Sequence, residues 1–133
     1  MCIRLIILFS IVALLVGCSQ PRTYEYFMLH PQTIKSELER CSTATPGSAT
    51  NDPSCVAAAR ADQDVRSLLA QATSNGQAFG ANLISDQIQL AAAEQALQTA
   101  KATQTNVTQA QAQYKVLQFK VQSKLAALSL LGV

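Results

Sequence analysis

The chain is poor in the residues from which active sites and large cores are built. It has 133 residues, no Trp, one His and only 5% aromatic residues. A lone histidine excludes metal motifs that need a histidine pair, and neither a nucleophile elbow nor a Gly-rich nucleotide loop occurs. Few aromatic residues also limit the size of the core. We therefore expect a thin helical protein that is not an enzyme and holds no cofactor or metal.

Strong charge of one sign is also missing. The formal net charge is +2, and one of the positive residues, Arg4, lies in the leader. A near-neutral chain lacks the basic surface that nucleic acids require, so no nucleic-acid partner is expected.

The leader has the pattern of an export signal. Arg4 precedes an apolar segment, residues 5–15, that is too short for the ~20 residues of a membrane-spanning helix. The next residues, up to Cys18, resemble the bacterial lipobox, where the signal is cut before a cysteine that is then lipid-modified. We expect residues 1–17 to be the signal peptide and residues 18–23 a lipidated tether. An ordinary signal peptide or an uncleaved anchor is the alternative.

Lipidation of Cys18 would place the protein in the bacterial cell envelope, facing the periplasm and bound to a membrane by its N-terminal lipid. Ser19 follows the cysteine. This resembles the sorting pattern of outer-membrane lipoproteins in enterobacteria, which favours the outer over the inner membrane.

Cys41 and Cys55 remain as an even pair in an exported chain, which predicts one disulfide. Closing this loop should stabilise the fold by ~3 kcal/mol. Two thiols and His30 give an incomplete zinc set, so a metal site is the weaker alternative.

Helical patterns surround the two cysteines. Pro31 begins a short helix with Cys41 at its apolar end, and Asp52 caps a second helix that begins at Pro53. On the second helix, spacing predicts a buried apolar stripe of Ala58, Ala61, Val65, Leu68, Leu69 and Ala72. The carboxylates of Glu37, Glu39, Asp62 and Asp64 are expected to be solvated.

An aromatic segment precedes the first helix. If they are exposed next to the lipid anchor, Tyr24, Tyr26, Phe27 and His30 would lie at the bilayer interface or form a contact surface for a partner. The favoured alternative is that this segment packs on the first helix and covers the disulfide, because large apolar side chains are mostly buried.

A turn between antiparallel helices is expected at residues 74–80, where Gly76 and Gly80 lie. A long helix then follows over residues 82–130, with a seam that is interrupted near Thr103 and Gln104. The predicted seam comprises Ala93, Leu97, Ala100, Val107, Ala110, Tyr114, Leu117, Val121, Leu125 and Leu128, with Lys115, Lys120 and Lys124 beside it. The long helix could leave one end free for a partner, self-associate or bend back.

The expected fold class is all-α: residues 24–60 form a disulfide-clipped helix–loop–helix, and residues 61–133 a helical hairpin or coiled-coil-like helix. The first segment resembles the EexN family of small lipoproteins from conjugation and type IV secretion gene sets. The shared features are the lipobox, an aromatic segment before His30 and Pro31, a Leu-x-x-Cys that ends at Cys41, and an Asp-Pro-x-Cys that ends at Cys55 before Ala57 and Ala58.

This resemblance implies entry exclusion: a recipient cell that holds a conjugative element refuses another copy, here by binding a component of the incoming transfer channel. It covers residues 1–60 and leaves the long helix unexplained. Two alternatives stay open, a structural lipoprotein subunit of a type IV secretion apparatus and a generic helical lipoprotein of the envelope.

Overall fold

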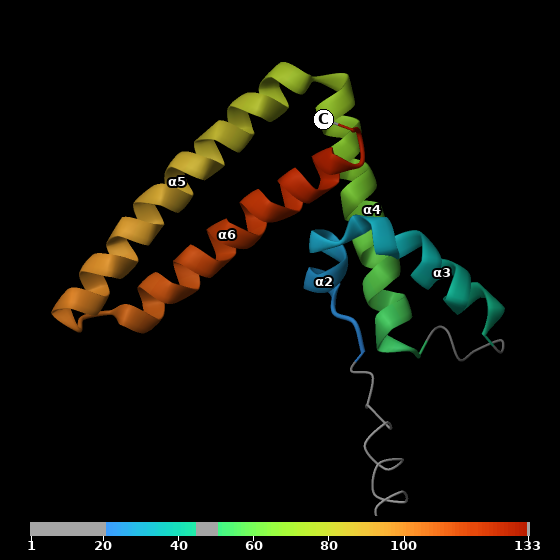
Figure 1. The fold of residues 1–133 in the computed structure, drawn as a ribbon, viewed down its shortest axis with the longest axis horizontal. Helices are drawn as coiled ribbons and strands as arrows, with labels where there is room; N and C mark the ends of the chain where they lie inside the picture. Colours follow the sequence, from blue (N-terminus) through green and yellow to red (C-terminus); the bar gives the residue numbers. More distant parts are fainter. Residues whose placement is uncertain (1–20, 45–50, 133) are drawn as a thin grey trace, which may run out of the picture.

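The computed structural model describes residues 21–44 and 51–132, and over these ranges every regular element is a helix (Figure 1). The expected all-α class is confirmed. The elements are α2 (Tyr24–Leu29), the 3-10 turn η2 (Pro31–Thr33), α3 (Ile34–Thr43), α4 (Pro53–Ser74), α5 (Gly76–Thr103) and α6 (Val107–Ser129). Cys18 and the rest of the leader lie outside the described residues.

The helix starts follow the chemistry of their first residues. The Thr23 hydroxyl accepts a hydrogen bond from the backbone N–H of Tyr26 and caps α2, a helix that the aromatic pattern did not predict. Pro31 opens η2, which leads directly into α3. Asp52 accepts from the Ser54 N–H at 2.8 Å, and Pro53 is the first residue of α4, as predicted.

The core lies where α2, α3, α4 and the end of α6 meet (Figure 1). Phe27 fills its centre and is fully buried. Ala58 and Ala61 are also fully buried, and such small residues let α2 come close to α4. The other buried members are Met28, Ile34, Val65 and Ala127. The predicted stripe on α4 is confirmed, with Leu68, Leu69 and Ala72 partly buried at its end.

The turn after α4 is shorter than expected. Only Asn75 separates α4 from α5, and its side chain accepts from the Ala78 N–H at 3.1 Å to cap α5. Gly76 and Gly80 lie inside α5, so a turn is present in the predicted region, but its predicted bounds, residues 74–80, were too wide. A single asparagine cap replaces the loop because it satisfies the first N–H groups of the new helix.

The long helix bends back on itself. It ends at Thr103, close to the predicted interruption, and α6 returns beside α5 as an antiparallel hairpin (Figure 1). Of the three arrangements left open by the sequence, this is the third. Gln104 has a left-handed backbone (φ 55°), and the Thr105 N–H donates to the Ala100 carbonyl at 3.1 Å, which closes the last turn of α5.

Most of the predicted seam lies inside this hairpin. Leu97, Ala100 and Val121 are buried, and the other members are half-buried except Leu125, which is 44% exposed. The prediction for Leu125 was wrong because the end of α6 packs on α2 and α4 as well as on α5. Its buried face there turns toward Ser123 and Ala127. None of the helices in the described ranges is long and apolar enough to cross a membrane.

The backbone of Gln104 generates a first prediction. A left-handed conformation strains a residue with a Cβ, whereas glycine adopts it freely. Gln104→Gly should therefore raise the free energy of unfolding by about 0.5–1 kcal/mol, measured by urea denaturation of residues 18–133. The matched control is Gln98→Gly inside α5, which should lower it by about 1 kcal/mol. Equal destabilisation by both variants would contradict a left-handed Gln104.

Candidate functional site

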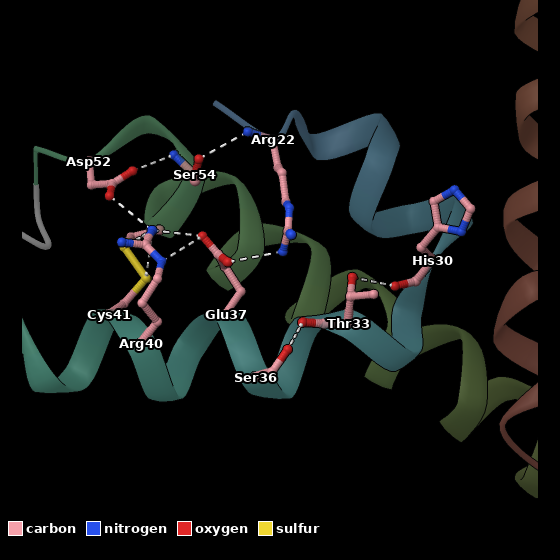
Figure 2. A network of polar contacts seen from close by, with 10 residues as sticks. Arg22, His30, Thr33, Ser36, Glu37, Arg40, Cys41, Asp52 and Ser54 are labelled. Atoms are coloured by element: carbon pink, nitrogen blue, oxygen red, sulfur yellow. Dashed lines mark hydrogen bonds and ion pairs between the residues drawn. A yellow bond between two sulfur atoms is a disulfide. The ribbon is translucent and has the colours of Figure 1, made fainter. Parts of the chain in front are cut away.

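The Cys41–Cys55 disulfide joins the last turn of α3 to the first turn of α4 (Figure 2). The two Cα atoms are 5.8 Å apart, and both cysteines are buried. The predicted pairing is confirmed. We call the unit formed by α2, η2, α3, this disulfide and the first half of α4 the clip.

Glu37 is buried beside the disulfide, with 6% of its surface exposed. The prediction that it is solvated was wrong, because Glu37 lies three residues after Ile34 and so on the same, inward face of α3. A buried carboxylate needs charged partners. The partners are Arg40, at 2.7 Å, and Arg22 from the tether, at 3.2 Å (Figure 2).

Arg40 connects this carboxylate to the start of α4. Its Nη2 also donates to Asp52 at 2.9 Å and lies 3.6 Å from the Sγ atom of Cys55. The hydrogen bond from Arg40 and that from the Ser54 N–H lower the pKa of Asp52, and the carboxylates of Glu37 and Asp52 raise the pKa of Arg40. The charged network therefore holds α3 and α4 together beside the disulfide.

Arg22 fastens the tether to the clip. Its backbone N–H donates to Ser54 Oγ at 3.0 Å, and its guanidinium donates to Glu37 at 3.2 Å. Figure 2 shows Arg22 reaching from the segment before α2 toward α3. The tether is thus ordered from its last residues onward, four positions after Cys18.

The aromatic segment is divided between core and surface. Phe27 is fully buried among core residues, so it is removed from the predicted contact surface. The segment packs on η2, where the predicted first helix begins, and also on α4 and α6. The guanidinium group of Arg40 lies beside the disulfide.

Tyr26 and His30 remain at the surface. Their rings lie 4.8 Å apart, and the Arg22 guanidinium lies 5.4 Å from the centre of the Tyr26 ring. His30 is exposed and Tyr26 half-buried. These two predicted contact residues are therefore adjacent, and both can touch a partner without a change in the fold.

Tyr24 lies on another side of α2, in an open groove of about 500 Å³ between α2, α4 and α6. Its hydroxyl donates to Asp64 at 2.8 Å, and the Arg60 guanidinium lies 4.8 Å from its ring centre. Burial and the Asp64 carboxylate raise the pKa of Tyr24. Met28, Leu68 and Phe119 supply apolar lining.

A second buried carboxylate lies in the hairpin. Asp86 is 4% exposed, and its carboxylate accepts hydrogen bonds from Lys120 Nζ at 2.7 Å and from Lys124 Nζ at 2.6 Å. Burial raises the pKa of Asp86, but the two ammonium groups outweigh it and the net shift is downward. The sequence analysis placed both lysines beside the seam but missed Asp86. Its spacing from Leu83 and Leu90 puts a lone charge on an apolar face, which was the available signal.

The acidic residues do not gather into a reactive site. Asp62 pairs with Arg66 at 2.7 Å, whereas Asp64 accepts from Tyr24, so these neighbours have separate partners. Within residues 21–44 and 51–132, no group of three His, Cys, Asp or Glu side chains is placed to hold a metal ion.

Comparisons of the chain with models of protein families, with curated proteins and with solved structures find no match. The functional argument therefore depends on the site itself and on the motifs of the sequence.

The Asp86 cluster generates a second prediction. Asp86→Asn removes the charge that two ammonium groups share, so it should lower the free energy of unfolding by about 2 kcal/mol at pH 7. Asp62→Asn, which breaks an exposed pair with Arg66, is the matched control and should cost less than about 0.5 kcal/mol. Urea denaturation measures both values.

Acid should remove the difference between the wild type and Asp86→Asn. A carboxylate whose pKa is lowered on folding contributes stability above its unfolded pKa of about 3.9, and this contribution is lost as the pH falls through the folded value. The two unfolding curves should therefore converge below about pH 4. A constant gap from pH 7 to pH 3 would show that Asp86 stabilises the hairpin by some other means.

Proposed function

We propose that the protein is a lipoprotein, anchored through Cys18 in the bacterial envelope, that mediates entry exclusion by binding a component of an incoming conjugation or type IV secretion channel. The proposal rests on the resemblance of residues 1–60 to the EexN family. It makes the protein a binding module rather than an enzyme, with its working surface on the periplasmic side, most favourably at the outer membrane.

One observation supports this proposal above the others. The residues that carry the resemblance fold into one unit: the aromatic segment supplies core residue Phe27, Pro31 turns the chain into α3, and Asp52 with Pro53 starts α4 so that Cys55 reaches Cys41. A set of scattered motif residues that forms a single packed clip is what a compact recognition module requires.

Tyr26 and His30 are the best candidates for partner contact. Exposed His30 and half-buried Tyr26 form a pair of tilted rings next to the cation of Arg22, and aromatic residues with arginine dominate the binding energy of protein interfaces. Tyr24 extends the surface toward the groove. Phe27 supports α2 from inside.

The alternative of a structural secretion subunit draws on the hairpin. Ile84, Ile88 and Val116 are each more than half exposed on α5 and α6, and apolar residues on an extended arm suit assembly with other subunits or with a second copy. A generic envelope lipoprotein would need neither surface.

Conjugation frequency tests the proposal. Recipient cells that express the protein should take up the cognate element less often than cells with an empty vector. Replacing Tyr26 and His30 together by Ala should remove about 2 kcal/mol of binding, roughly thirtyfold in affinity, and restore uptake. Cys18→Ser should also restore uptake although the helices still fold.

The matched control for the contact residues is Glu25→Ala, an exposed residue of the same helix, which should leave exclusion intact. Equal uptake by expressing and empty recipients would refute entry exclusion. Loss of export when the gene is deleted from the donor would instead favour the structural subunit.

A further inference from the structure

The tether is too short to let the domain move far from its anchor. Only Ser19, Gln20 and Pro21 separate Cys18 from Arg22. Four Cα–Cα steps span at most about 14 Å even when fully extended. Since Arg22 is held by Ser54 and Glu37, this limit applies to the clip itself and not to a loose segment before it.

The end of the clip that carries Arg22 also bears an exposed apolar side chain. Val56, in the first turn of α4, is 56% exposed. The nearby charges are compensated, because Arg22 and Arg40 pair with Glu37 and Asp52. This surface therefore presents little net charge to lipid headgroups, and the covalent anchor supplies the attraction.

We infer that the clip end of α4, with Val56 and Arg22, lies against the bilayer that holds the Cys18 lipid, and that the far end of α4 points away from it. This rests on the lipidation that the proposed function assumes. The bilayer is the partner of this surface, because the lipid-bearing Cys18 lies within about 14 Å of Arg22 along the tether.

The fold then sets the distances of the other parts. Val56 and Gln77 are separated by nearly the whole length of α4, about 30 Å at 1.5 Å per residue. The joint between α4 and α5 is thus the end of α4 farthest from the bilayer, and the hairpin slopes away from this joint, back toward the level of the clip (Figure 1). A partner is met from a fixed orientation rather than from a swinging tether.

Tryptophan fluorescence tests this arrangement, because the chain has no tryptophan of its own. Val56→Trp and Gln77→Trp are made separately in the lipidated protein and inserted into phosphatidylethanolamine–phosphatidylglycerol vesicles. Lipids brominated in the upper acyl chain serve as quencher. The emission of Val56→Trp should fall several-fold more than that of Gln77→Trp. Equal quenching, or none at either site, would overturn the inference.

One further variant and one further measurement make the result specific. Arg22→Ala combined with Ser54→Ala should reduce the quenching of Val56→Trp, and unchanged quenching would overturn the role of the tether contacts. The mass of the protein shows whether Cys18 carries a lipid. If Cys18 is lipidated and Val56→Trp is not quenched, the inferred orientation alone is refuted. If Cys18 carries no lipid, both the orientation and the anchor of the proposed function are refuted.

Discussion

A buried carboxylate, that of Glu37, holds the tether to the clip together with the hydroxyl of Ser54. Burying a charge is unfavourable unless ionic partners surround it, so Glu37 fixes Arg22 from one segment and Arg40 from its own helix. Arg40 continues to Asp52, the cap of α4, and lies beside the disulfide. Arg22, the end of α3 and the beginning of α4 are therefore joined at one point.

Asp86 forms a similar ionic junction in the hairpin. It too is a buried carboxylate shared by two cations, here Lys120 and Lys124, and it joins α5 to α6. The core of the clip contains three alanines, Ala58, Ala61 and Ala127, and Phe27 is its one fully buried large side chain. Each alanine buries little apolar area. A disulfide and two ionic junctions therefore supplement the packing of a chain with few aromatic residues.

The sequence predicted what local chemistry decides: the disulfide, the Asp52–Pro53 helix start and the stripe from Ala58 to Val65. It did not predict the two buried carboxylates, because Arg22 and both lysines come from other segments and no spacing rule connects Arg22 with Glu37 or Asp86 with Lys124. The helix breaks were placed only approximately. Gln104 ends α5 without glycine or proline, and Asn75 turns the chain in one residue, so composition gave weak signals at both.

The clip accounts for the motif residues, and the anchor proposed at Cys18 turns the clip into a module of fixed position. The central claim is that Arg22 and Glu37 interact strongly enough to dock the tether. A double-mutant cycle with Arg22→Met, Glu37→Gln and both together, followed by urea denaturation, measures that interaction directly. The account predicts a coupling energy of about 1 kcal/mol. Additive effects of the two substitutions would contradict it, because the pair of Arg22 and Glu37 would then contribute nothing to the contact between the tether and the clip.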